Sequence, residues 1–397
     1  MEKPALYGGI PVREKPLSYG KQYIDEDDIR AVTEVLRGDF LTGGPYVAEL
    51  ERKLCKITGA KYAVAVSNGT AALHLAALAA GFGPGDEVIV SSITFAASSN
   101  CVLYCGATPV FADIRPDTCN IDPGQIEKLI TPATKGVIAV DFTGQAVEQD
   151  EIRRICEEHN LVFIEDAAHA IGTKYKGRPV GSMADMTTFS FHPVKTVTSG
   201  EGGAITTNDE KLYRKLMRLR THGITRNQSE MVHPTDAGWY NEQVELGFNY
   251  RITDMQAALL TSQLDKLDVF SARRAQIVKR YDRAFSEMPE LVVQREIPES
   301  ETTRHLYILR LNLEKLTCDR REFFDALHAE NIYAQVHYLP VYWHSYYEKL
   351  GYEKGLCPCA EKFYEEVMSI PLFYAMTDND AEDVICAVKK LIAYYRR

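Results

Sequence analysis

Short runs of β-branched and apolar residues alternate with stretches of helical spacing along the chain from residue 61. The expected strands cover residues 62–66, 87–91, 109–112, 136–140 and 161–165. The expected helices between them cover residues 71–80, 96–105, 123–130 and 148–159. Such alternation is typical of parallel strands joined by crossover helices, so it predicts an α/β fold whose mostly parallel sheet carries helices on both faces. A ligand site is expected beyond the carboxyl ends of the strands.

The length of 397 residues exceeds that of a usual single core, which favours one large and one small domain. We expect residues 1–265, an N-terminal arm included, to form the large domain and residues 266–397 to form a smaller α/β domain. Two more strands of the large sheet are expected at residues 187–191 and 203–207, as a hairpin-like pair. The small domain is expected to contain strands at residues 306–313 and 334–338 and helices at residues 320–330, 359–368 and 380–395.

The segment between that strand pair combines a lysine, a histidine, hydroxyl side chains and glycines, and it is too irregular for a helix or a strand. Lys195 stands there among aromatic and β-branched residues rather than among charges. Because desolvation disfavours the ammonium form, it makes the neutral amine available as a nucleophile, which suits Schiff-base chemistry. The other interpretation is a surface lysine in a turn.

Two further segments offer what a pyridoxal phosphate site needs. Ser67-Asn68-Gly69-Thr70 precedes an alanine-rich helix, so the amides of Gly69 and Thr70 could hold a phosphate, although a simple capping turn is the alternative. Asp166 ends a buried strand, where a carboxylate is costly without a cationic partner such as a protonated pyridine nitrogen. Period-2 alternation puts Glu165 on the opposite face. Helix capping by Asp166 is the competing interpretation.

Two ring-bearing residues near these segments are further candidates. Phe95 follows the next strand, where an aromatic side chain could lie against a cofactor ring, although a core phenylalanine is also compatible with the sequence. His169 could hydrogen-bond the ring hydroxyl or stack on the ring, with a structural histidine as the alternative.

Composition and charge exclude several functional classes. A net charge of -10 argues against nucleic acid or an anionic membrane as the principal partner, and no apolar stretch approaches the length of a membrane span. Nine cysteines without an N-terminal leader lead us to expect reduced thiols in a cytoplasmic protein. Cys357 and Cys359 have no companion pair at metal-ligand spacing, so no metal is expected.

The motifs occur in a recognisable order. Ser-Asn-Gly-Thr, then Glu-Asp-Ala-Ala-His, then Ser-Phe-His-Pro-Val-Lys with Gly-Glu-Gly-Gly, and finally Gly-Phe-Asn-Tyr-Arg at residues 247–251 together resemble the DegT-type family of nucleotide-sugar aminotransferases. This resemblance covers nearly the whole chain. It implies an aspartate-aminotransferase-like fold (PLP fold type I), a large seven-stranded-type sheet and pyridoxal 5'-phosphate as cofactor.

The resemblance also implies roles for individual residues. Lys195 matches the lysine that binds the cofactor covalently, and Asp166 matches the partner of its pyridine nitrogen. Ser190, with Gly69 and Thr70, resembles the phosphate ligands. Asn249 matches an asparagine that reaches the phosphate across a dimer interface, which implies a homodimer with composite sites, although by sequence alone it could be a turn residue.

Within the family, a branch of sugar dehydratases has histidine in place of this lysine, so Lys195 favours transamination. The chain looks most similar to the members that transfer an amino group from L-glutamate to carbon 4 of a UDP-linked 4-keto-6-deoxy-N-acetylhexosamine in pseudaminic acid biosynthesis. The alternatives are another 4-keto or 3-keto nucleotide sugar, a lyase-type enzyme, or a regulatory protein that binds the cofactor without turnover. The candidate substrate contacts are Tyr19, Asp39, Phe40, Leu41, Thr42, Gln335, Val336, His337 and Tyr338.

Overall fold

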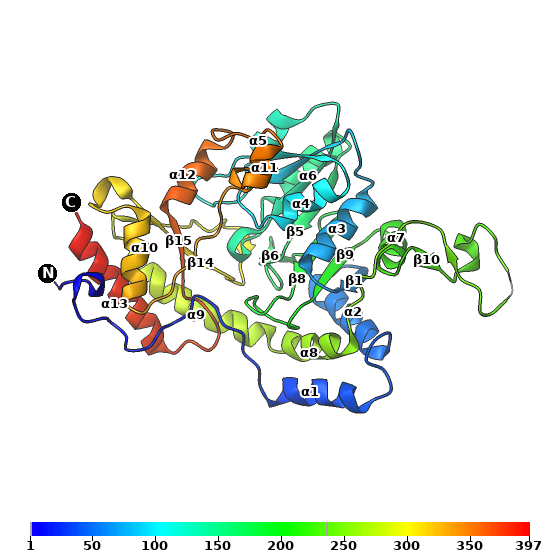
Figure 1. Ribbon diagram of the computed structural model, residues 1–397, viewed down its shortest axis with the longest axis horizontal. Helices are drawn as coiled ribbons and strands as arrows, with labels where there is room; N and C mark the ends of the chain where they lie inside the picture. Colours follow the sequence, from blue (N-terminus) through cyan, green and yellow to red (C-terminus); the bar gives the residue numbers. More distant parts are fainter. Residues whose placement is uncertain (1, 236) are drawn as a thin grey trace.

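A computed structural model describes residues 2–235 and 237–397 (Figure 1). Over these residues the largest sheet has seven strands in the order β1-β9-β8-β5-β4-β2-β3. Only β9 runs antiparallel to its neighbours. The strands are β1 (Tyr62–Val66), β2 (Glu87–Ser91), β3 (Thr108–Ala112), β4 (Thr134–Val140), β5 (Val162–Asp166), β8 (Met186–Ser190) and β9 (Gly203–Thr207). The predicted fold class is therefore confirmed, and each expected strand of this sheet lies within two residues of its predicted ends.

Helices cover both faces of this sheet, as the continuous apolar character of its strands predicts. Along β1, Val64 and Val66 pack toward one layer of helices while Ala63 and Ala65 pack toward the other. The first layer contains α3 (Gly69–Ala80), α4 (Ala97–Tyr104) and α7 (Glu210–Arg220). The second contains α2 (Pro45–Thr58), α5 (Pro123–Leu129), α6 (Gln149–Glu158) and α8 (Asp254–Leu264).

A smaller α/β unit follows the long helix α9 (Leu267–Phe285), which leads away from α8 in Figure 1. Its antiparallel sheet has the order β12-β14-β15. Its elements are β12 (Leu291–Val293), β14 (Tyr307–Leu311), α10 (Arg320–Ala329), α11 (Ser345–Lys349), α12 (Pro358–Glu366), β15 (Val367–Ile370) and α13 (Asp378–Tyr395). The expected boundary after residue 265 falls between α8 and α9, and the division into two domains stays a prediction.

In the smaller unit one predicted strand is wrong, and one predicted helix is present but ends earlier than expected. Residues 334–338 do not form a strand, because they pair with the sheet only through the bridge between Gln335 and Ser369. The helix expected at residues 359–368 ends at Glu366, and the next four residues form β15. The sheet therefore takes its third strand from Val367–Ile370 and leaves residues 334–338 free to face the large sheet.

Two segments extend beyond the main body. The N-terminal arm runs along the smaller unit, where Leu17 bridges Ile332 and the Leu372 amide donates to the Tyr19 carbonyl, before α1 (Glu26–Arg37) packs on α8. After α7 the short pair β10 (Ile224–Thr225) and β11 (Glu242–Gln243) lies in a segment that projects away from the body (Figure 1). Two-residue strands also form a small sheet, β13 (Ser300–Glu301), β6 (Lys174–Tyr175) and β7 (Arg178–Pro179). None of the described helices combines the length and apolar character that crossing a membrane requires.

The contact between β9 and the start of α3 predicts the effect of one substitution. A Cβ atom at Gly203 would lie 2.4 Å from the Asn68 carbonyl oxygen, and a backbone atom cannot swing aside. We expect Gly203→Ala to lower the free energy of unfolding by about 1–3 kcal/mol, the usual cost of overpacking. Gly83→Ala is the matched control, because nothing lies within 4 Å of its added Cβ. Urea titration of both variants measures the difference, and equal stability would contradict the packing argument.

Candidate active site

A cavity of about 770 Å³ lies at the carboxyl ends of the parallel strands. Val140, Asp166 and Ser190 reach it from the last residues of β4, β5 and β8. Phe95 enters from the segment after β2, and Gly69 is the first residue of α3, which follows β1. The other wall comes from the N-terminal arm and the smaller unit, through Tyr19, His305, His337 and Tyr338. A cavity therefore lies at the position where the ligand site is expected.

Lys195 lines this cavity from the loop that joins β8 to β9. The loop closes on itself, since the Ser199 amide donates to the Phe191 carbonyl and the Lys195 amide donates to the His192 carbonyl. Burial lowers the pKa of Lys195 to about 8, and the negative charge of Asp166 partly opposes this shift. Among the described residues its Nζ has no hydrogen-bond or ion-pair partner. A neutral amine is therefore accessible near physiological pH.

Asp166 lines the same cavity with only 4% of its surface exposed. The Ser98 hydroxyl donates to its Oδ2 at 2.6 Å, and the Ala168 amide donates to its Oδ1 at 3.1 Å. Burial raises the pKa of Asp166, while these two donors and the charge of Lys195 oppose the rise. Glu165 points to the other face of the strand, where it accepts from Thr187, so the predicted alternation of these two acids is confirmed.

The start of α3 forms a tight cradle against β8. Asn68 caps the helix by accepting from the Ala71 amide at 2.8 Å. A Cβ atom at Gly69 would lie 2.8 Å from the Ser190 Cβ, so only glycine lets the helix start approach the strand this closely. Gly69, Thr70 and Ser190 all line the cavity. A helix N-terminus with free amides and nearby hydroxyls favours an anion at this end of the site.

Three histidines and a tyrosine line the opposite side. His169 is buried, its ring centre lies 4.5 Å from that of His305, and its Nε2 lies 3.3 Å from the Tyr338 hydroxyl. Burial lowers the pKa of His169 and of His305 well below the ordinary value, and it lowers that of His337 to about 4. The three rings are thus neutral at pH 7 and can serve as hydrogen-bonding groups without adding charge.

Two aromatic residues stand at the cavity wall. Phe95 is 63% exposed and lies 6.3 Å from the Tyr338 ring, so a flat ligand could cover its free face. Tyr19 reaches from the N-terminal arm, with its ring centre 5.4 Å from that of His337. The arm therefore contributes to the cavity, and the role of Tyr19 as a substrate contact stays a prediction.

Other sequence candidates lie outside the cavity of this chain. Asp39, Phe40, Leu41 and Thr42 are exposed between α1 and α2. Asn249 is exposed and bridges Thr221. Gln335 is tied to Ser369 by backbone hydrogen bonds, and Val336 packs beside a buried cluster. The structure brings together the cofactor candidates other than Asn249 and, of the substrate candidates, Tyr19, His337 and Tyr338.

The groups in the cavity fit pyridoxal phosphate. The cradle of Gly69 and Ser190 suits the phosphate, because a Cβ at Gly69 would fill the space between helix and strand. Asp166 offers a buried carboxylate to a protonated ring nitrogen, and Lys195 offers an amine of lowered pKa. The buried Nδ1 of His169 has no hydrogen-bond partner among the described residues, which leaves one polar atom for a ligand or water.

Ser98 and His305 were missed by the sequence reasoning, although both line the cavity. Ser98 lies three residues after Phe95 at the start of α4, so helical spacing could have placed it near the site. His305 precedes β14 in the smaller unit, and no local signal ties it to residues more than a hundred positions earlier.

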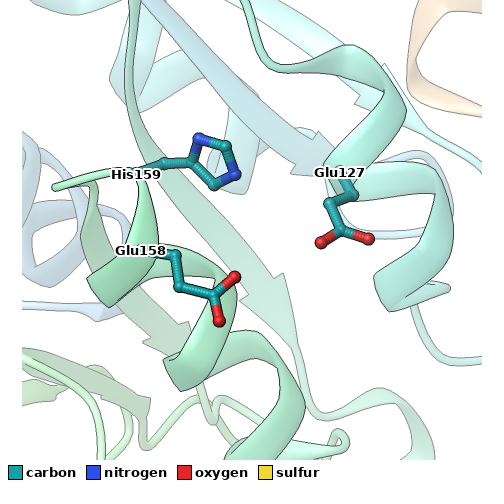
Figure 2. A group of neighbouring side chains, drawn as sticks. All are labelled: Glu127, Glu158 and His159. Carbon is teal, nitrogen blue, oxygen red and sulfur yellow. The ribbon is translucent and has the colours of Figure 1, made fainter.

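A group of possible metal ligands lies elsewhere, on the surface (Figure 2). Glu127 comes from α5, and Glu158 and His159 come from the end of α6. Arg154 already pairs with Glu158 at 2.7 Å and lies 3.7 Å from Glu127. The cluster is exposed and its negative charge is partly neutralised by this arginine, so it does not support a metal site.

Comparison with known proteins places the chain among sugar aminotransferases. The DegT/DnrJ/EryC1/StrS aminotransferase family model matches residues 22–389. The spore coat polysaccharide biosynthesis protein SpsC of Bacillus subtilis is 41% identical, over 96% of this chain and 99% of that protein. The UDP-4-amino-4,6-dideoxy-N-acetyl-beta-L-altrosamine transaminase of Campylobacter jejuni is 39% identical, over 93% of this chain and 95% of its own length.

Solved structures agree with this placement. Helicobacter pylori PseC, an aminotransferase of pseudaminic acid biosynthesis, superposes with a TM-score of 0.89 at 32% identity, over 96% of this chain and 100% of that chain. The sugar aminotransferase Spr1654 of Streptococcus pneumoniae in its PLP form has a TM-score of 0.89 at 32% identity, over 96% and 99% of the two chains. The chain therefore belongs to the DegT/DnrJ/EryC1/StrS aminotransferase family and is a pyridoxal-phosphate-dependent nucleotide-sugar aminotransferase.

Proposed function

We propose that the protein transfers the amino group of L-glutamate to carbon 4 of a UDP-linked 4-keto-6-deoxy-N-acetylhexosamine. The observation that supports this most is that the Lys195 amine and the Asp166 carboxylate line one cavity together with an anion cradle. The sugar is suggested by similarity to the altrosamine transaminase and to PseC, which supports a 4-keto sugar of the pseudaminic acid type.

Lys195 is the base in this proposal. Its neutral Nζ would take the proton from the α-carbon of the amino donor in the first half of the reaction, and its protonated form would deliver a proton to carbon 4 of the sugar in the second. The lowered pKa makes the neutral form available, while the closed loop from Phe191 to Gly202 holds the side chain at the cavity. The two substrates would use the same site in turn, which is ping-pong kinetics.

Other residues orient and stabilise the reacting groups. Pyridoxal phosphate, when bound, supplies an electron-poor ring that accepts the electron pair left behind by the departing proton. Asp166 would hold the ring nitrogen proton, and Gly69, Thr70 and Ser190 would hold the phosphate. His169 would hydrogen-bond the ring hydroxyl, which its neutral state and its position in the cavity allow.

The sugar nucleotide would lie toward the smaller unit. Tyr19, His337 and Tyr338 face the cavity there and offer hydroxyl and imidazole groups to a hexose. Asn249 is exposed, so in a dimer the Asn249 side chain of one copy could reach the cofactor phosphate bound in the other copy. We therefore include a homodimer with composite sites in the proposal, with residues 39–42, Gln335 and Val336 as candidate contacts to the longer substrate.

A second candidate function has a specific basis. SpsC is 41% identical to this chain, slightly more than the altrosamine transaminase, and its name assigns it to spore coat polysaccharide biosynthesis. An aminotransferase for another keto nucleotide sugar that feeds a polysaccharide would have the same cofactor site. The two candidates differ only in the sugar.

A panel of keto nucleotide sugars distinguishes these candidates. With glutamate as donor, we expect amination of the UDP-4-keto-6-deoxy-N-acetylhexosamine to exceed that of dTDP-linked and 3-keto sugars by at least about tenfold in kcat/KM, the usual effect of one well-placed polar contact. Mass spectrometry of the product locates the new amine. Preference for another sugar of the panel would transfer the assignment to the second candidate.

Mixing two inactive variants tests Lys195 and the composite site together. Lys195→Ala should lower activity by at least about 10²–10⁴-fold because it removes the base. Asn249→Ala should weaken cofactor binding in the partner's site, so that this variant is inactive at a cofactor concentration that just saturates the wild type. Since half of randomly mixed dimers are hybrids with one intact site, refolding the two variants together should restore about a quarter of wild-type activity. Failure to recover any activity would argue against sites shared between subunits.

The lowered pKa of Lys195 predicts a pH dependence for cofactor capture by the cofactor-free protein. A neutral amine is required, so the capture rate should rise about tenfold per pH unit up to about pH 8 and level off above it. Asp166→Asn removes the charge that favours the ammonium form, so its profile should shift to lower pH. Nα-acetyl-lysine is the control, with a rate that keeps rising toward pH 10. Stopped-flow absorbance gives the rates, and a protein midpoint near 10 would contradict a buried amine.

A further inference from the structure

We propose that Ser98 is a positioning residue for Asp166 and that a chain of hydroxyls, Thr94 to Ser98 to Asp166, keeps this carboxylate charged toward the cofactor. The inference rests on the proposed role of Asp166 at the ring nitrogen. Ser98 belongs to none of the sequence motifs described above. Among the described residues, its hydroxyl is the one polar contact that helix α4 makes to the Asp166 carboxylate.

The geometry of the chain is tight and buried. Ser98 Oγ lies 2.6 Å from Asp166 Oδ2, and Thr94 Oγ1 lies 2.7 Å from Ser98 Oγ. Ser98 has no exposed surface, Thr94 has 2% and Asp166 has 4%. All three residues also line the cavity, so the chain forms part of its wall. In such a setting water cannot replace a lost donor without entering the packed wall.

The direction of the hydrogen bonds follows from proton counting. An ionised carboxylate only accepts, so the single hydroxyl hydrogen of Ser98 goes to Asp166. The Phe95 carbonyl lies 3.3 Å from the same hydroxyl, but a charged acceptor at 2.6 Å is the stronger one. The Ser98 oxygen is then free to accept, which makes Thr94 the donor to Ser98.

This orientation has a chemical consequence. Burial favours the neutral form of Asp166, and the donors from Ser98 and Ala168 favour the charged form. A carboxyl that took up the ring proton would no longer hold it on the ring nitrogen. Ser98 therefore acts on the cofactor through Asp166. Its hydrogen bond stabilises the ionised carboxylate and fixes the orientation of the carboxylate group.

Ser99 offers a matched comparison on the same helix. It is as fully buried as Ser98, but its hydroxyl lies 2.5 Å from the Tyr347 hydroxyl, which in turn donates to Asn100. Each of Ser98→Ala and Ser99→Ala deletes one buried hydroxyl. The first removes hydrogen bonds to Asp166 and Thr94, and the second removes those to Tyr347 and to the Ala96 carbonyl. Only the first deletes a contact to Asp166.

The experiment compares these two variants, with Asp166→Asn as a reference, in the full chain. Ser98→Ala should weaken the affinity for pyridoxal phosphate roughly ten- to hundred-fold relative to Ser99→Ala, the usual effect of a hydrogen bond to a buried charge. In protein loaded with isotope-labelled cofactor, the NMR shift of the ring nitrogen should show loss of its proton roughly one to two pH units lower. Thermal melting of the cofactor-free proteins should show that both variants are folded at the temperature of the binding assay.

The outcomes are distinguishable. Equal affinities and equal ring-nitrogen titrations in the two serine variants, with both altered in Asp166→Asn, would overturn the role of Ser98 alone. An unchanged titration in Asp166→Asn would overturn the proposed role of Asp166 itself. Should Ser98→Ala not fold, Thr94→Val removes the donor to Ser98 without altering α4. A smaller shift of the ring-nitrogen titration in the same direction would support the chain of hydroxyls. No shift of this titration would contradict it.

Discussion

An amine and a carboxylate are desolvated together in one cavity, and the rest of the site is arranged around them. Burial pushes both Lys195 and Asp166 toward their neutral forms, while each favours the charged form of the other. Neither group would be held in this balance at the surface, where water would restore ordinary pKa values. The parallel sheet supplies the burial, because it carries helices on both faces and the cavity lies at the carboxyl ends of its strands.

The antiparallel strand β9 is what makes the lysine loop possible. In a purely parallel sheet the chain leaving β8 would cross over through a helix and return at the opposite end. Here β9 pairs directly with β8, so the loop starts and ends at the carboxyl edge. Gly203 then passes the Asn68 carbonyl at a distance that excludes any side chain. The lysine loop and the anion cradle are thereby locked side by side.

The smaller unit supplies the remaining wall of the cavity without adding a fixed charge. Its three aromatic contributions, His305, His337 and Tyr338, are neutral at pH 7 because burial opposes their ionisation. Charge in the cavity is thus concentrated at Lys195, Asp166 and Glu201. A wall of neutral donors and acceptors can orient a sugar by hydrogen bonds, which suits a substrate defined by the stereochemistry of its hydroxyl and keto groups.

The sequence by itself determined the large sheet, because buried parallel strands read as short apolar runs between helical stretches. The resemblance of its motifs to a known family indicated Lys195, Asp166, Gly69 and Ser190 as a group, and all four line one cavity. The prediction from the sequence was wrong at residues 334–338, whose alternation resembles a strand although one bridge alone pairs them, and at β15, where helix passes into strand without a turn residue. Only the tertiary structure decided that Ser98 donates to Asp166 and that His305 stands against His169. Contacts of this kind join residues far apart along the chain, and their distances depend on how the helices and the smaller unit pack, which no local pattern encodes.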